Sequence, residues 1–274
     1  MDLRIVNTCN NDCLYCLESS LRNKKKFIST KELFQKISNE EIKDNITFFW
    51  WNPLLHPDFF KIIQFAYSKG FHSIWVLTNW FWISQSFLEK FQNLWGTTIW
   101  LYFHSFDEKN HDIITWKSGN YVTFLNTLQL ISNSWLYTKC IIHVNGGNIK
   151  TIAKDVLNLY WKYKIKHFDF VNYFPFDKPY LHKAYLDYSV EGNRETIDLL
   201  CKVLLKTKVK ANFMKFPKDF FGNYQMFYNF ERWVINQIGE EDYDRLDTNK
   251  EPFCYKENRC NSCFIKDNCK FYEL

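Results

Sequence analysis

The chain has 274 residues and a net charge of +5 at pH 7, from 35 Lys and Arg against 30 Asp and Glu. This length allows one large domain with at most a small appendage, and so mild a charge does not by itself predict a nucleic-acid-binding surface. Because the first residues do not resemble a signal peptide and no apolar run reaches membrane-spanning length, we expect a cytoplasmic protein with no membrane partner.

Strand-like and helix-like segments alternate from the amino terminus to about residue 172. Predicted strands cover residues 3–6, 46–49, 73–78, 98–103, 137–144 and 167–172. Predicted helices cover residues 29–37, 57–68, 84–93, 120–131, 149–163 and 191–206. Such alternation favours an α/β fold with a parallel sheet and crossover helices. We expect this domain to span residues 1–210, with a short cysteine-rich extension over residues 211–274.

Three cysteines, Cys9, Cys13 and Cys16, follow the first predicted strand with the spacing Cys-x3-Cys-x2-Cys. Three thiolates on one loop can hold three corners of a [4Fe–4S] cluster and leave the fourth iron without a protein ligand. A zinc site with a fourth ligand elsewhere is the alternative, although structural zinc sites typically pair their ligands as Cys-x2-Cys on two knuckles. In a reducing compartment, this grouping favours metal ligation over disulfides.

The loop resembles the cluster-binding loop of the radical S-adenosylmethionine (SAM) enzymes. This resemblance implies that SAM chelates the open iron and that one-electron reduction cleaves it to a 5′-deoxyadenosyl radical, the electron coming from an external reductant of the flavodoxin or ferredoxin type. It also implies the partial (β/α)6 TIM-like barrel of that family, which the six predicted strands match. Barrels of this kind place function at the carboxyl ends of their strands.

The resemblance extends to the end of the second predicted strand. Trp50, Trp51, Asn52 and Pro53 are similar to the family's Gly-Gly-Glu-Pro element, which receives the amino group of SAM. The Asn52 side-chain oxygen can accept from an ammonium group, but without the charge assistance of a carboxylate. A simple Asn-Pro turn is the alternative interpretation of Asn52. Trp50 and Trp51, if they are tryptophans, would crowd the methionyl end of SAM.

Later strand ends supply further candidates for SAM contacts. Asn79 stands in a Thr-Asn-Trp triplet similar to the family's Thr-Asn-Gly, and His104 with Ser105 is similar to a His-Ser strand ending in the family. The resemblance makes His104 and Ser105 candidates for the ribose hydroxyls or the SAM carboxylate, and places Asn145 near the ribose. Tyr15 occupies the position of an aromatic residue that contacts adenine. A histidine at a strand end also has a purely structural interpretation.

Tryptophan and glycine are used in unusual proportions. The chain has 11 Trp and only 8 Gly, so glycine makes up about 3% against an average of about 7%. Trp50, Trp51, Trp80 and Trp135 stand where a turn or a close backbone approach would favour glycine. Our hypothesis is that these tryptophans are UGA codons that the source organism reads as glycine. A genuinely tryptophan-rich protein is the alternative.

A second group of cysteines lies within the last 21 residues, spaced Cys-x5-Cys-x2-Cys-x5-Cys. Four thiolates suffice for a second, fully ligated [4Fe–4S] cluster or for an all-cysteine zinc site. The segment is similar in part to the auxiliary-cluster segments called SPASM and Twitch in radical SAM maturases. Its candidate ligands are Cys254, Cys260, Cys263 and Cys269.

The sequence therefore predicts a radical SAM enzyme, and the auxiliary cysteines favour peptide or protein modification. A tRNA or a small metabolite is the alternative substrate. A non-catalytic iron–sulfur or zinc-binding protein, which kept the fold and lost SAM binding, is the alternative class. The aromatic-rich segments are expected to pack rather than to stack on bases, so a nucleic-acid partner is not expected.

Overall fold

The structure is a computed structural model. It describes residues 1–16, 19, 27–173, 178–189, 191–214, 216 and 222–227. Within these residues, no helix combines the length and the apolar character needed to cross a membrane.

One parallel sheet of seven strands organises the chain, and the strands follow one another in sequence order, so that β1 and β7 form the two edges. Consecutive parallel strands require crossover connections, and helices supply them. The strands are β1 (Asp2–Arg4), β2 (Ile46–Phe49), β3 (Ile74–Thr78), β4 (Gly96–Phe103), β5 (Tyr137–Val144), β6 (His167–Asn172) and β7 (Lys210–Met214).

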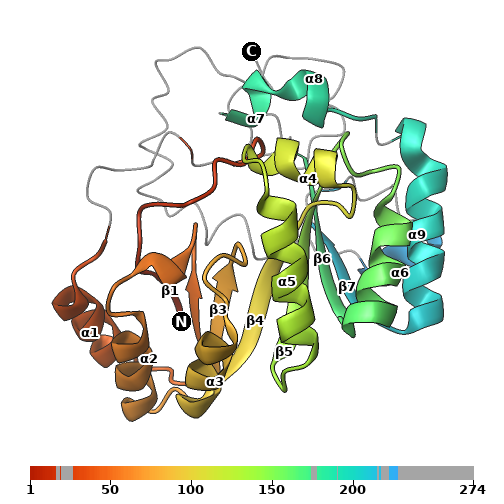
Figure 1. The fold of residues 1–274 in the computed structure, drawn as a ribbon. Helices are drawn as coiled ribbons and strands as arrows, with labels where there is room; N and C mark the ends of the chain where they lie inside the picture. Colours follow the sequence, from red (N-terminus) through yellow and green to blue (C-terminus); the bar gives the residue numbers. More distant parts are fainter. Residues whose placement is uncertain are drawn as a thin grey trace, which may run out of the picture.

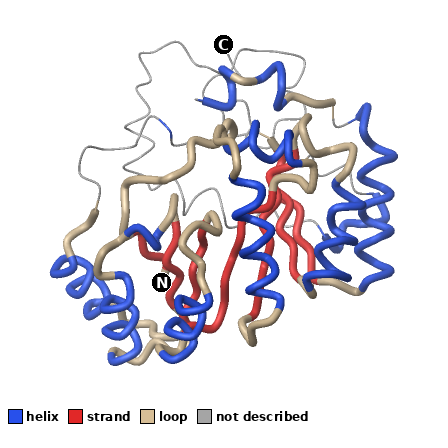
Figure 2. The backbone as a smooth tube through the Cα atoms, in the orientation of Figure 1, coloured by secondary structure: helices blue, strands red, loops and turns tan. Residues whose placement is uncertain are grey.

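Helices cover one face of this sheet and form an outer layer around it (Figures 1 and 2). The long ones are α1 (Thr30–Asn39), α2 (Phe59–Ser68), α3 (Gln85–Asn93), α4 (Glu108–Thr115), α5 (Asn120–Ser132), α6 (Ile152–Tyr163) and α9 (Arg194–Thr207). The short ones are α7 (Lys178–Leu181), α8 (Lys183–Leu186), η2 (Pro53–Leu55), η3 (Glu191–Asn193) and η5 (Gly222–Phe227). Together, sheet and helices form the partial barrel predicted from the sequence.

Local signals explain where several helices begin and end. The Ser29 and Ser84 side chains accept hydrogen bonds from the first turns of α1 and α3, as N-cap residues do. Gly70 ends α2 with a φ of 98°, a conformation that glycine adopts without a steric penalty.

Besides the short helices α7, α8, η2 and η5, the structure adds a strand and a longer helix that the sequence did not predict. Strand β7 extends the sheet to seven strands, and helix α4 lies between β4 and α5. Strands β2, β5 and β6 begin and end as predicted. Most of the proposed extension over residues 211–274, including its four cysteines, lies outside the described residues.

The inner face of the curved sheet carries an apolar middle layer formed by Leu77, Ile141, Val171 and Met214. Because side chains alternate along a strand, residues two positions earlier on β5, β6 and β7 share this face but lie nearer the amino ends. These residues are Lys139, Asp169 and Asn212. The apolar layer therefore separates the amino ends of the strands, here called the base, from their carboxyl ends, here called the mouth.

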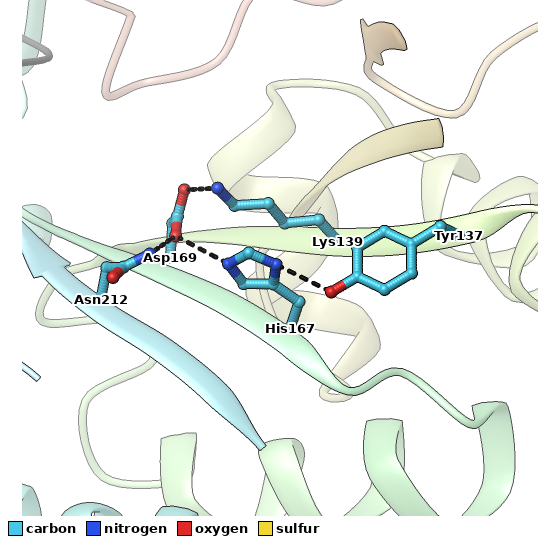
Figure 3. A network of polar contacts seen from close by, with 5 residues as sticks. All are labelled: Tyr137, Lys139, His167, Asp169 and Asn212. Carbon is cyan, nitrogen blue, oxygen red and sulfur yellow. Dashed lines mark hydrogen bonds and ion pairs between the residues drawn. The ribbon is translucent and has the colours of Figure 1, made fainter. Parts of the chain in front are cut away.

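A closed polar network occupies the base (Figure 3). Its members are Tyr137, Lys139, His167, Asp169 and Asn212. Buried Lys139 and buried Asp169 form an ion pair, and the Asn212 amide donates to the second Asp169 oxygen at 2.8 Å. The Tyr137 hydroxyl and His167 Nδ1 lie 3.0 Å apart. Every polar group that this network buries thus has a partner, as a stable interior requires.

Candidate active site

The cysteine loop, residues 5–16, runs from β1 across the mouth to α4 (Figure 1). Two backbone hydrogen bonds fasten it there, from Leu14 N to Ile114 O at 2.9 Å and from Asp12 N to Thr115 O at 3.4 Å. Leu14 is buried against Tyr173 and Leu186. A loop held by backbone bonds and an apolar anchor presents its remaining side chains in defined positions.

Cys9, Cys13 and Cys16 are partly exposed cysteines of this loop, and none of them forms a disulfide. Two N–H groups point at the Cys9 sulfur, the Asn11 backbone N–H at 3.4 Å and Asn79 Nδ2 at 3.3 Å. Hydrogen bonds of this kind to ligand sulfurs are one of the means by which proteins tune iron–sulfur clusters. Three thiols on one anchored loop, one of them already receiving N–H donors, are a donor set that fits a [4Fe–4S] cluster.

The three cysteines do not form a site for a single metal ion. Among the residues that the structure describes, no three His, Cys, Asp or Glu side chains are gathered closely enough to hold one. A [4Fe–4S] cluster takes each thiolate on a different iron, so its ligands need not gather as closely as those of a single ion.

Asparagine amides connect the cysteine loop to the ends of β2 and β3. Asn10 Oδ1 accepts from Asn52 Nδ2 at 2.9 Å and from Asn79 Nδ2 at 3.1 Å. The Asn52 oxygen already accepts two hydrogen bonds, from Thr78 Oγ1 at 2.9 Å and from Leu54 N at 3.3 Å. Buried Asn52 therefore has no acceptor position left for a ligand in this arrangement.

Asn79 differs from Asn52 in this respect. Its Oδ1 atom is buried and has no hydrogen-bond partner, and the same holds for Asn10 Nδ2. An unpartnered buried polar group costs about 1–3 kcal/mol, so it calls for an explanation. A ligand that donates to Asn79 Oδ1 and accepts from Asn10 Nδ2 would satisfy both.

Three tryptophans fill the mouth beside these amides. Trp50 and Trp51 are almost fully buried, and the Arg4 guanidinium lies 4.3 Å from the centre of the Trp50 ring. Trp80 is completely buried, with its ring about 5 Å from the rings of His104 and His111. All three indole N–H groups lack a hydrogen-bond partner. Three buried rings thus occupy this part of the mouth.

Aromatic and imidazole rings form the neighbouring wall. Tyr15 stacks on His143 with ring centres 4.2 Å apart, and its hydroxyl lies 3.4 Å from His104 Nε2. Burial raises the pKa of Tyr15 well above its usual value. Burial, with the nearby His111 and His143 adding to it, lowers the pKa of His104. His104 is therefore neutral at physiological pH and has one ring nitrogen that accepts.

His111 is the second buried imidazole of this wall. Burial lowers its pKa to about 4, and its Nε2 atom is buried without a hydrogen-bond partner, while its Nδ1 faces the Ser105 carbonyl at 3.4 Å. It is thus a neutral ring with an unused nitrogen beside Trp80.

Ser105 and Asn145 make local contacts instead. The Ser105 hydroxyl accepts from Asp107 N at 2.9 Å, next to the start of α4. The Asn145 amide donates to His143 O at 2.7 Å, and its oxygen accepts from Gly147 N at 2.9 Å. Both side chains therefore shape turns at the mouth, and neither offers an unused atom of the kind found on Asn79.

The structure thus brings Tyr15, Asn52, Asn79 and His104 together with the cysteine loop. It adds four residues that the sequence did not single out as site residues: Asn10, His111, His143 and Asn148. Asn148 Nδ2 bridges the carbonyl groups of His104 and His143 at 3.0 and 2.9 Å. Position offered a signal for two of them, because Asn10 lies within the cysteine motif and His143 lies at the end of a predicted strand.

A known protein family matches the amino-terminal part of the chain. Residues 3–157, more than half of the chain, match the family model described as the Radical SAM superfamily. This match covers the cysteine loop and the first five strands. No curated protein matches the chain.

Solved structures with a similar fold are distant in sequence. SuiB of Streptococcus suis is 12% identical with a TM-score of 0.59, over 92% of this chain and 53% of SuiB. The chain therefore spans about half the length of SuiB. A structure of anSMEcpe with bound AdoMet and a peptide, Kp18Cys, is 14% identical with a TM-score of 0.62, over 76% of this chain and 62% of anSMEcpe. At these identities, the likeness establishes the fold.

Proposed function

Because the chain belongs to the radical SAM superfamily, we propose that it is an enzyme that cleaves SAM reductively at a [4Fe–4S] cluster held by Cys9, Cys13 and Cys16. When bound, the cluster and SAM would supply the 5′-deoxyadenosyl radical that abstracts hydrogen from a substrate. The observation that carries the proposal is the anchored three-cysteine loop beside unpartnered buried amides at the mouth.

The chain's own residues would hold SAM through the mouth. The free acceptor Asn79 Oδ1 would receive the amino group of SAM, because both acceptor positions of Asn52 are used. Asn52 would hold Asn10 and the β3 end in place. The stacked rings of Tyr15 and His143 offer a flat surface for adenine. His104, neutral and next to Tyr15, would meet the ribose hydroxyls, while Ser105 and Asn145 would shape the turns beside it.

Peptide or protein modification is the proposed reaction class. Support comes from the fold neighbours: SuiB has been solved bound to the precursor peptide SuiA, and anSMEcpe with AdoMet and the peptide Kp18Cys. A reductant of the flavodoxin or ferredoxin type and a cytoplasmic location belong to the same proposal. So does a second [4Fe–4S] cluster, or a zinc ion, at Cys254, Cys260, Cys263 and Cys269.

Anaerobic reconstitution tests this function. The natively produced chain is loaded with iron and sulfide and then given SAM and dithionite, and 5′-deoxyadenosine is measured by chromatography. We expect 5′-deoxyadenosine in the loaded chain and none after Cys9→Ala. A loaded cluster that yields no 5′-deoxyadenosine would refute the enzyme and leave the non-catalytic iron–sulfur protein.

Metal analysis tests the proposed second cluster, and isotope labelling tests the proposed peptide substrate. Iron and sulfide contents of about eight each per chain indicate two clusters, whereas about four each with bound zinc indicates zinc at the C-terminal cysteines. Deuterium transferred to 5′-deoxyadenosine from a labelled peptide encoded beside this chain would support peptide modification. Transfer from a tRNA or a small metabolite instead would contradict it.

A further inference from the structure

Tryptophan dominates the residues with left-handed backbone. In the part of the chain that the structure describes, eight non-glycine residues have a positive φ, and six of them are tryptophans. Yet tryptophan makes up only 11 of the 274 residues. The six have φ values between 51° and 78°: Trp50, Trp51, Trp80, Trp82, Trp95 and Trp116.

This conformation is unfavourable for a bulky side chain. A positive φ brings Cβ too close to the following carbonyl oxygen, so a bulky residue there is a steric outlier. Glycine has no Cβ and adopts the same angles freely. Six such outliers of one residue type point to a common origin.

Two helix ends in this chain provide a direct comparison. Gly70 ends α2 with bonds from Gly70 N to Tyr67 O at 2.9 Å and from Phe71 N to Ala66 O at 3.2 Å. Trp116 ends α4 with the equivalent bonds, from Trp116 N to Ile113 O at 3.1 Å and from Lys117 N to Asp112 O at 3.0 Å. This pattern is the Schellman motif, whose left-handed residue is usually glycine. Trp116 thus stands in a glycine position.

The buried members of the set show a second irregularity. The indole N–H groups of Trp50, Trp51 and Trp80 have no hydrogen-bond partner although they are buried. Native tryptophans that are buried usually have one. The surroundings of these three residues were therefore not built around an indole.

Two other tryptophans of this chain have ordinary strand backbone and indole rings with polar partners. Trp75 and Trp100 lie in β3 and β4, outside the positive-φ set. Trp75 Nε1 donates to Ser73 Oγ at 2.8 Å, and Lys139 Nζ lies 4.3 Å from the centre of the Trp100 ring. Trp135 also lies outside the positive-φ set and is almost fully exposed, so the backbone does not support the glycine prediction made for it.

We infer that the native chain carries glycine at positions 50, 51, 80, 82, 95 and 116, encoded by UGA, and tryptophan at positions 75 and 100. Glycine at 50, 51 and 80 removes three buried rings from the mouth, among them the Trp80 ring about 5 Å from the rings of His104 and His111. The effect of this removal on SAM binding rests on the proposed function; the backbone argument does not.

Thermal unfolding tests the backbone argument with one type of substitution at matched exposed sites. Trp82→Gly and Trp116→Gly relieve a positive φ and lose little contact, since both side chains are mostly exposed. Each is expected to raise Tm by about 2–4 °C. Trp161→Gly is the control: Trp161 is also mostly exposed but lies within α6, where glycine is expected to lower Tm by about 1–3 °C. A lower Tm for all three variants would overturn the inference.

Mass spectrometry of the natively produced protein tests the identity directly. We expect glycine at the six positions and tryptophan at 75 and 100. Tryptophan at Trp116 in a native peptide would overturn the inference.

SAM binding separates this inference from the proposed function. The triple substitution Trp50→Gly, Trp51→Gly and Trp80→Gly is expected to tighten SAM binding to the reconstituted chain at least tenfold. If the exposed variants gain stability and the triple variant binds no SAM, the glycine assignment stands and the proposed function fails. If the triple variant binds SAM but Trp82→Gly and Trp116→Gly lose stability, the assignment fails and the function stands.

Discussion

The mouth and the base of the barrel differ in how completely their buried polar side chains are hydrogen-bonded. At the base, the Lys139–Asp169 ion pair, Asn212, His167 and Tyr137 satisfy one another (Figure 3). At the mouth, Asn10, Asn79 and His111 keep buried atoms without partners. A network that is complete in the protein alone serves stability, whereas an incomplete one fits a ligand that supplies the missing partners. We therefore expect substitutions at the base to change stability and those at the mouth to change ligand binding.

The largest effect is expected at the cysteine loop. Cys9→Ala removes one of the three proposed cluster ligands and the sulfur that accepts from Asn79. We expect complete loss of 5′-deoxyadenosine formation, measured after anaerobic reconstitution, with little change in Tm. Cys201→Ala is the matched control, because Cys201 is a buried packing residue of α9 whose pKa burial raises to about 12. Loss of activity in the control at unchanged stability would contradict the assignment.

The ion pair at the base is expected to give the largest stability effect. Lys139→Met leaves the buried Asp169 carboxylate without its cation, and breaking a buried pair in this way destabilises by about 3–5 kcal/mol. Urea unfolding measures this change. The double variant Lys139→Met with Asp169→Asn removes both charges and is expected to recover part of the loss. A Lys139→Met chain as stable as the unsubstituted one would show that the base network is not structural.

His167 is expected to make stability depend on pH. Burial, reinforced by Lys139 and Lys210 and opposed by Asp169, lowers the pKa of His167 to about 4. The Tyr137 hydroxyl contacts the Nδ1 atom of this ring. Since the unfolded value is about 6.5, the unfolded state binds more protons between these values. His167 therefore contributes stability above about pH 6.5, and this contribution, about 1–3 kcal/mol, is lost as the pH falls toward 4.

Urea unfolding at pH 7 and pH 4.5 measures this contribution. His167→Gln is expected to flatten the pH dependence relative to the unsubstituted chain. Burial also lowers the pKa of His111 to about 4 and raises the pKa of Asp155 to about 6. Both groups are present in the variant and in the unsubstituted chain, so their contributions to the pH dependence cancel when the two chains are compared. An unchanged pH dependence in the variant would contradict the assignment.

Asn79→Ala is expected to have the smallest effect of these substitutions and to separate ligand binding from stability most clearly. Asn79→Ala removes the proposed acceptor for the amino group of SAM. In the reconstituted chain with glycine at positions 50, 51 and 80, we therefore expect about tenfold weaker SAM binding, or about 1.4 kcal/mol. Stability should change little, because the unpartnered Oδ1 already carries a penalty in the free protein. Asn212→Ala at the base is the matched control and should lower stability without changing SAM binding.

Most of the fold could be predicted because apolar periodicity and capping residues mark the elements. Strands β2 and β3 are apolar runs, and Ser29 and Ser84 mark helix starts. Strand β7 was missed because Lys210 and Asn212 interrupt its apolar pattern, and these polar side chains are explained by the sheet edge and by the bond to Asp169.

Only those site residues that belong to a short sequence motif could be predicted. The cysteine spacing indicated the loop, and strand ends indicated Asn79 and His104. The buried atoms without hydrogen-bond partners could not be predicted, because they depend on which amides meet across the mouth. The Asn52 oxygen accepts from Thr78 and Leu54, whereas the Asn79 oxygen accepts from no group. The distinction between the two asparagines is a property of three-dimensional contacts that their sequence neighbours do not reveal.

The most direct test of the division between mouth and base is the yield of 5′-deoxyadenosine per folded chain. In a chain with glycine at positions 50, 51 and 80, Cys9→Ala and Lys139→Met are reconstituted side by side with iron and sulfide and given SAM and dithionite below their unfolding temperatures. We expect no 5′-deoxyadenosine from Cys9→Ala and an undiminished yield per folded chain from Lys139→Met. Equal yields from the two variants, or a loss confined to Lys139→Met, would contradict a catalytic mouth above a structural base.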